Sequence, residues 1–156
     1  MAASNSSVGI KAALLLTWLI TLSGGVVLIG AVGALSSDAG SPFPADYKLA
    51  WTAISLEVAS LLVALYALLV GPYSQWKSSV VSMLTMVTAI LVPITNLVIN
   101  NKLALPGANG SEARANTATA GLIIVMIGNL LITLLSSQHG NDAAPAAEHV
   151  SGKDMA

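Results

Sequence analysis

The chain has 156 residues, of which 55% are apolar and only 8% are charged, whereas an ordinary soluble domain has about 25% charged residues. This composition excludes a soluble globule and a disordered chain. The formal net charge is -1 with six Lys and Arg residues, so no basic face is available to bind nucleic acid. The chain has no cysteine, which excludes disulfides, thiolate catalysis and zinc–thiolate sites.

Four long apolar runs dominate the sequence. About 20 helical residues, rising about 1.5 Å each, cross the hydrocarbon core of a bilayer. Lipid offers no hydrogen-bond partner, so each run must satisfy its own backbone as a helix, and the runs lack the alternation of barrel strands. The predicted fold class is an all-α membrane protein, a four-transmembrane-helix bundle with short loops. The spans are expected at about 12–35, 49–70, 80–99 and 115–135.

The bundle is expected to occupy residues 1–135, followed by a flexible polar tail at 136–156 that is rich in alanine. The short segment 71–79 requires the second and third spans to be antiparallel neighbours. Pro93 removes one backbone hydrogen bond from the third span, and the expected result is a bend. Aromatic rings favour the boundary between lipid and water, and five of them gather at the ends of the second span: Phe43, Tyr47, Trp51, Tyr73 and Trp76.

Four spans place both termini on the same side of a membrane. Basic residues favour the cytosolic side, but here the count is equal: Lys11, Lys77 and Lys153 on the side of the termini, and Lys48, Lys102 and Arg114 on the other. We expect a multi-pass integral membrane protein with cytosolic termini, because pairs of spans joined by short polar outer loops are a common insertion pattern. The sequence does not specify which membrane.

Glu57 is the only ionisable residue inside the predicted spans. It lies about 5 Å from the bilayer centre by helical rise, where a charge costs about 2.5–3.5 kcal/mol. Small residues share its helix face at spacings of three and four. Because small side chains allow helices to approach closely, we expect this face to pack against other helices and Glu57 to point into it. The helix-packing residues are Ala53, Ser60, Ala64, Ala67 and Gly71.

Two roles are open for Glu57. In the first, the carboxyl binds a proton or cation and changes partners during transport, as intramembrane carboxylates often do. In the second, burial keeps the carboxyl protonated and it donates a hydrogen bond to a neighbouring helix. The candidate partners are Asn96 in the third span and Asn129 in the fourth, with Ser82, Thr85 and Thr88 also available. The structural role is favoured, because a transport path normally needs more than one ionisable group.

The predicted spans contain no His, Cys, Lys, Arg or Asp, whereas catalysis needs several titratable groups gathered together. No phosphate-binding loop or metalloprotease motif is present. We therefore expect no enzyme activity, no cofactor and no metal site. The sequence favours an accessory or structural subunit that lies in the lipid bilayer and packs against other membrane proteins or as a homo-oligomer. The alternative is a small transporter or channel that uses Glu57 as its proton or cation site.

Overall fold

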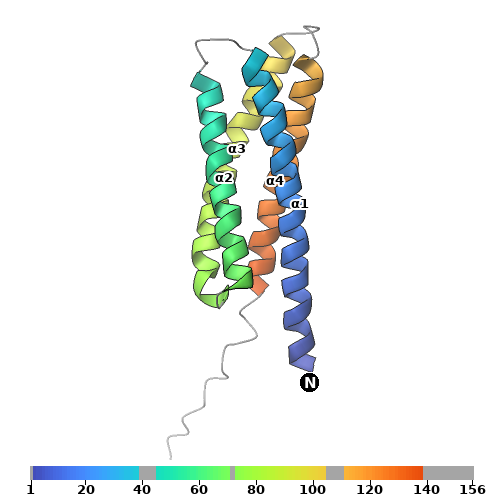
Figure 1. The fold of residues 1–156 in the computed structure, drawn as a ribbon, viewed down its shortest axis with the longest axis vertical. Coiled ribbons are helices and arrows are strands. Elements are labelled where there is room, and N and C mark those ends of the chain that lie inside the picture. The colour runs from blue at the N-terminus through green and yellow to red at the C-terminus, as the bar shows by residue number, and fades with distance from the viewer. Residues whose placement is uncertain (1, 39–44, 71–72, 105–110, 139–156) are drawn as a thin grey trace, which may run out of the picture.

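A computed structural model of the chain describes residues 2–38, 45–70, 73–104 and 111–138. These residues form four helices, which run alternately up and down (Figure 1). The fold class predicted from the sequence, an all-α four-helix bundle, is confirmed. The helices are α1 (Ala2–Asp38), α2 (Ala45–Leu69), α3 (Tyr73–Ala104) and α4 (Ser111–Gln138).

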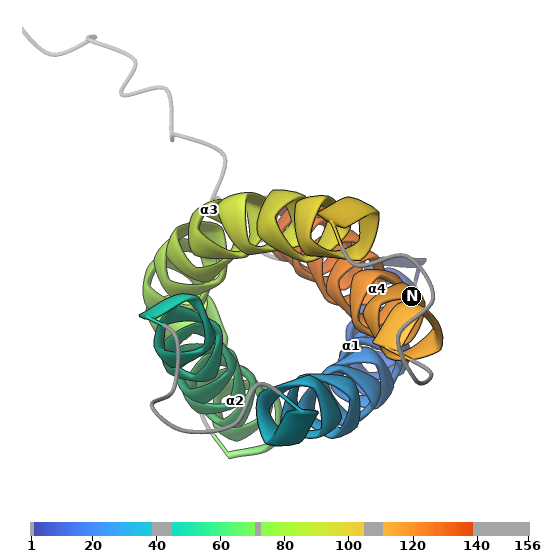
Figure 2. The same ribbon diagram turned by 90° about the horizontal axis from the view of Figure 1, so that it is seen from above.

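The four helices form a ring in chain order (Figure 2), in which each helix packs against its two neighbours. The most extensive contact joins α1 and α4, the first and last helices. Helix α1 is the longest, and its N-terminal turns extend beyond the ends of the other three (Figure 1). α3 runs as one helix through Pro93.

All four helices are long and apolar enough to cross a membrane. Their outward side chains are largely aliphatic. For example, Leu16 and Leu19 of α1 and Ile127 and Leu134 of α4 are each more than half exposed. Such a surface is unfavourable in water and suited to lipid. The chain therefore has the architecture of a multi-pass membrane protein.

The helices extend beyond the predicted spans at most of their ends. Candidate spans in the structure are Val8–Ser37, Tyr47–Leu69, Tyr73–Asn100 and Glu112–Gln138. Polar residues next to an apolar run continue the helix, because the backbone keeps its i to i−4 hydrogen bonds past the edge of the hydrocarbon. The predicted tail boundary at Ser136 is too early, since α4 continues to Gln138 and Ser136 is fully buried. Residues 139–156 of the predicted tail lie outside the described residues.

Glycines allow α1 and α4 to approach closely. A methyl group at Gly121 would lie 3.0 Å from the backbone nitrogen of Leu28 and 3.1 Å from the carbonyl oxygen of Gly24. One at Gly128 would lie 2.0 Å from Oγ1 of Thr21. Backbones this close gain van der Waals contact, which drives helix association in lipid.

Side-chain hydrogen bonds also join the helices away from this contact, and two of them lie in the same half of the bundle. The indole Nε1 of Trp18 in α1 donates to the backbone carbonyl of Leu61 in α2 at 2.8 Å. The hydroxyls of Tyr73 at the start of α3 and Ser136 near the end of α4 are hydrogen-bonded to each other. Both bonds lie in the half of the bundle that contains the short α2–α3 connection.

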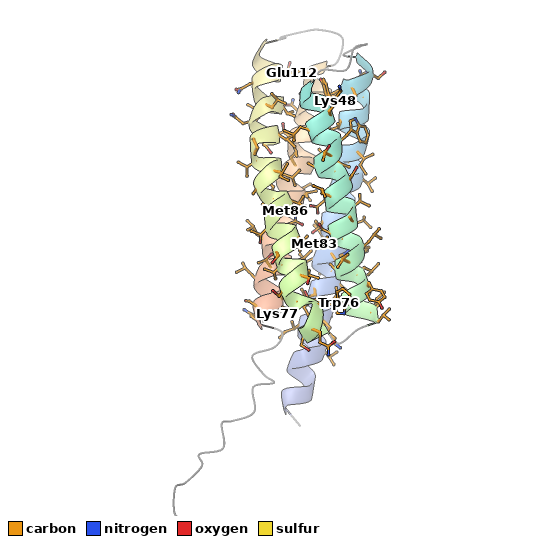
Figure 3. All side chains as sticks on the ribbon, turned by 90° about the vertical axis from the view of Figure 1, so that its left-hand side faces the viewer. Lys48, Trp76, Lys77, Met83, Met86 and Glu112 are labelled. Carbon is orange, nitrogen blue, oxygen red and sulfur yellow. The ribbon has the colours of Figure 1, made fainter. Side chains whose placement is uncertain are left out.

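The two ends of the bundle carry basic and aromatic side chains (Figure 3). Lys48 and Glu112 lie at one end, and Trp76 and Lys77 lie at the other. The rings of Trp76 and Tyr66 meet edge to face with their centroids 5.7 Å apart. Amphipathic rings and lysines at both ends are typical of helices that cross a bilayer.

The buried interior consists of two apolar clusters. One includes Leu28, Ala53 and Leu122 and lies toward the α1–α2 connection. The other includes Leu14 and Leu84 and lies toward the α2–α3 connection. In α1, α2 and α4 a polar residue lies between the residues of one cluster and those of the other, and in α3 Thr88 directly follows Val87 of the first cluster. These four residues form a central polar layer: Thr21, Glu57, Thr88 and Asn129.

Candidate intramembrane polar site

Glu57 lies at the centre of the polar layer because of the residue spacing in α2. Its side chain is only 2% exposed. Ala53, Ser60 and Ala64, which precede and follow it at intervals of three and four, are also buried. Since residues at these intervals share one helix face, the packing of the alanines against the other helices turns the carboxyl inward.

Asn129 of α4 connects Glu57 to a third helix. Its Nδ2 donates to Oε2 of Glu57 at 2.9 Å and to Oγ1 of Thr88 in α3 at 3.2 Å. The Thr88 hydroxyl in turn donates to the backbone carbonyl of Leu84 at 2.7 Å. This chain of hydrogen bonds ties α2, α3 and α4 together at one level of the bundle.

Helix α1 contributes packing to the polar layer. Thr21 is fully buried, and its hydroxyl donates to the carbonyl of Thr17 one turn earlier at 2.8 Å. Its side chain lies directly against Gly128, the residue before Asn129. A larger residue at position 128 would push α4 away from α1 and would displace the neighbouring Asn129.

Two oxygen atoms of this site have no hydrogen-bond partner. They are Oε1 of Glu57 and Oδ1 of Asn129, and both are buried. The side chains that carry them are already joined through their other polar atoms. A buried acceptor without a donor costs about 1–3 kcal/mol, so the site favours an occupant that supplies positive charge or a donated hydrogen.

Of the two asparagines that the sequence suggested as partners for Glu57, only one contacts it in the structure. Asn129 is 1% exposed and makes the expected contact. Asn96 is exposed, and its selection as a partner is wrong. It follows the buried Ile94 by two residues, and two residues turn a helix by about 200°. Asn96 therefore lies on the opposite side of α3.

The predicted helix-packing face of α2 is turned toward the interior. Ala53, Ser60, Ala64 and Ala67 are each at most 1% exposed, whereas Gly71 lies outside the described residues. This face packs within the chain's own bundle. The buried strip is wider than its small residues alone, because Leu61 is also buried.

Sequence reasoning missed the contact between Thr21 and Gly128 as part of this site. The available signal was the Gly128–Asn129 pair, which places a close-approach position directly beside a polar side chain. Thr88 was only one of several hydroxyl candidates, and Ser82 and Thr85 are exposed.

Among the described residues, Oε1 of Glu57 and Oδ1 of Asn129 are the buried side-chain polar atoms without a hydrogen-bond partner, and so the candidate ligands for an ion. Among residues 2–38, 45–70, 73–104 and 111–138, no three His, Cys, Asp or Glu side chains lie close enough to hold a metal. The two histidines of the sequence lie outside these ranges. Comparisons of the chain with protein-family models, with curated proteins and with solved structures find no match.

Proposed function

We propose that this chain is a non-enzymatic accessory or structural membrane protein that packs against partner membrane proteins or against copies of itself. The sequence predicts packing through small-residue faces, but the small-residue face of α2 is enclosed by the bundle. The proposal is instead supported by the outward side of α3, which is unusually polar for a surface at membrane depth.

The outer α3 face lies opposite the buried positions Val80, Leu84 and Leu91. It carries small and polar residues along its length, whereas the outward side of α4 carries large aliphatic residues such as Ile127 and Leu131. All residues of the outer α3 face are exposed: Ser78, Ser82, Thr85, Ala89, Pro93, Asn96 and Asn100.

Lipid is a poor solvent for this face. Thr85 satisfies its own hydroxyl by donating to the carbonyl of Val81 at 2.8 Å, but a carboxamide such as Asn96 offers two donors and an acceptor. Another helix can supply partners that hydrocarbon lacks, and the small residues Ser82 and Ala89 would let it approach closely. A helix–helix contact therefore explains why polar residues lie on this side.

The absence of cysteine makes the proposal directly testable. A benzophenone maleimide attached to Thr85→Cys or Ala89→Cys reports which molecules lie beside the outer α3 face in the native membrane. The matched control is Leu131→Cys on the outward side of α4, where the side chain is 45% exposed. We expect protein adducts at both α3 positions and mainly lipid adducts at the control. Equal yields of protein adducts on α3 and α4, or lipid adducts alone, would contradict the proposal.

In this proposal the Glu57–Asn129 contact has a structural role, because it links α2 to α4 across the interior of the bundle. Glu57→Gln retains hydrogen-bonding groups, so folding and the α3 adducts should persist. Glu57→Leu removes those groups and leaves Asn129 buried without its acceptor, which costs about 1–3 kcal/mol. Thermal unfolding of the two variants in mild detergent compares these effects.

Transport is the second candidate function, with Glu57 as a proton or cation site in a small transporter or channel. It is favoured by the two unpartnered oxygens of Glu57 and Asn129. The test is ion flux into liposomes that contain the purified protein. If the carboxyl titrates during transport, Glu57→Gln abolishes flux while the protein stays folded. Flux that is absent from the wild-type protein under proton, sodium and potassium gradients would exclude this function.

We also propose that the termini face the cytosol. Basic residues are divided equally between the two sides, so the proposal rests on the common insertion pattern in which pairs of spans are joined by short polar outer loops. A membrane-impermeant maleimide, added outside intact cells, should label Glu112→Cys at the opposite end and leave Ser74→Cys unlabelled. The reverse labelling pattern would invert the topology.

A further inference from the structure

The central polar layer contains two buried acceptor atoms that lack a hydrogen-bond donor. Oε1 of Glu57 and Oδ1 of Asn129 are buried without a partner, on side chains that are 2% and 1% exposed. The two residues are also bonded to each other, through Nδ2 of Asn129 and Oε2 of Glu57 at 2.9 Å. The pair therefore uses one donor and one acceptor and leaves one acceptor on each side chain.

An ionised Glu57 cannot supply the donor that these two acceptors lack. A carboxylate has only acceptors, and the carbonyl oxygen of an amide is also only an acceptor. A neutral carboxylic acid has one donor and one acceptor, as does the edge of a carboxamide. A proton on Oε1 would let Glu57 donate to Oδ1 of Asn129 while it accepts from Nδ2 through Oε2. Each side chain would then satisfy the other.

No positively charged side chain within the described interior could pair with an ionised Glu57 in place of the proton. Apart from Glu57, the buried polar residues of this interior are Thr17, Thr21 and Ser36 of α1, Ser60 of α2, Tyr73 of α3, and Asn129 and Ser136 of α4, with the partly buried Thr88 of α3 beside Asn129. None of these side chains can carry a positive charge. The basic side chains of the described helices lie toward the bundle ends. In α2 the nearest is Lys48, nine residues from Glu57, or about 13 Å along the helix.

A metal cation fits the site less well than a proton. Hard cations take about six or more oxygen ligands, and two unpartnered oxygens are present. The neighbouring Thr88 hydroxyl already donates to the carbonyl of Leu84 at 2.7 Å and accepts from Nδ2 of Asn129 at 3.2 Å. A proton needs only a donor oxygen and an acceptor oxygen, which Glu57 and Asn129 supply.

We propose that the Glu57–Asn129 pair is a proton-binding site in which the proton lies on Oε1 of Glu57 and is hydrogen-bonded to Oδ1 of Asn129. This inference deepens the second candidate function, because it names the ion, and the bound proton is equally compatible with a structural role. The proton enters from water and leaves to water without any other change in bonding. Its loss leaves two buried acceptors without a donor and removes one of the two hydrogen bonds that would link α2 to α4.

Infrared spectroscopy of the protein in lipid bilayers tests the proposal, because a protonated carboxyl has a carbonyl band that a carboxylate lacks. The sequence contains only three glutamates, Glu57, Glu112 and Glu148, so ¹³C-labelled glutamate confines the isotope shift to these residues. At neutral pH we expect a protonated-acid band in the wild-type protein that shifts with the label. The band should disappear in Glu57→Gln and persist in Glu112→Gln, whose parent side chain is exposed.

The partner of the proton is tested through Asn129. In Asn129→Leu the band should move to higher frequency, because the carbonyl loses its donor. If this variant fails to fold, exchange into heavy water serves the same purpose in the wild-type protein: a small, slow downshift indicates a buried acid proton. A carboxylate band for Glu57 in folded wild-type protein at neutral pH would overturn the proposal. Loss of the acid band on addition of sodium or potassium would overturn it in favour of a metal cation.

The outcomes separate this inference from the transport function. An acid band without ion flux supports the proton site and excludes transport by this protein. Flux that depends on Glu57 in a protein without the acid band supports transport and overturns the proton site. Protein adducts at the outer α3 face bear on neither result, because that face lies on the opposite side of α3 from the interior.

Discussion

Gly128 is the position at which the smallest change should have the clearest effect on the bundle. A methyl group at this position would lie 2.0 Å from Oγ1 and 2.9 Å from Cβ of Thr21. Thr21 is fully buried, and its hydroxyl is held by the carbonyl of Thr17. Side chains that branch at Cβ have restricted χ1 rotamers in a helix. Gly128→Ala therefore requires α1 and α4 to separate or Thr21 to leave its present position.

The expected cost follows from two opposing contributions. An extra methyl group in a well-packed interior costs about 1–3 kcal/mol. Alanine in place of glycine in a helix returns up to about 1 kcal/mol. We expect Gly128→Ala to lower the free energy of unfolding by about 1–2 kcal/mol, which reduces the ratio of folded to unfolded protein by about 5- to 30-fold.

The assay is reversible unfolding in mixed micelles, with a graded increase in denaturing detergent and helix content followed by circular dichroism. The matched control is Gly25→Ala in α1, where an added methyl group meets nothing within 4 Å. This control should be at least as stable as the wild-type protein. In the double variant Gly128→Ala with Thr21→Ala, much of the lost stability should return, because the hydroxyl and methyl groups of Thr21 are gone and only the contact with its Cβ remains.

Two results would refute this reasoning. If Gly128→Ala is as stable as Gly25→Ala, then α1 and α4 do not approach as closely as the structure has them. If Thr21→Ala restores none of the stability lost in Gly128→Ala, then the cost arises from another contact. The double-mutant cycle isolates the pair only if neither single variant forms a new interaction.

Three further substitutions test the contacts between helices. Trp18→Phe keeps most of the buried ring but loses the bond to the carbonyl of Leu61, so the free energy of unfolding should fall by about 0.5–1.5 kcal/mol. Tyr73→Phe and Ser136→Ala break the same hydrogen bond, so in a double-mutant cycle their effects should not add, and full additivity would contradict the bond. Lys77→Gln should change stability by less than about 0.5 kcal/mol, because its contact with α4 is exposed. Each value comes from the same detergent titration.

The features predictable from the sequence are those that depend on local spacing. The lengths of the apolar runs determine the four helices, because a lipid-exposed backbone has no alternative to helical hydrogen bonds. The inward orientation of Glu57 follows from the i, i+3 and i+4 positions of Ala53, Ser60 and Ala64. Neither inference requires knowledge of which helix lies beside α2.

The partner of Glu57 depends on the rotation and axial position of the other helices, which local spacing does not determine. Asn96 and Asn129 each lie in an apolar span, and local spacing does not show which side of either span faces Glu57. Packing decides between them, because the rows that contain Leu91 and Ile94 in α3 and Val125 in α4 face the interior. The contact of Thr21 with Gly128 depends in the same way on the axial alignment of α1 and α4.

The location of small residues alone does not identify a surface for partners in lipid. The alanines of α2 and Gly121 and Gly128 of α4 are already used by contacts within the chain, and a face that is buried in its own bundle cannot also bind another protein. A partner surface must therefore combine exposure with a polarity that hydrocarbon does not satisfy. Among the described helices, the outer α3 face combines these properties most fully through Asn96. The residue that was wrong as a partner for Glu57 thus becomes the main reason to place an external partner on α3.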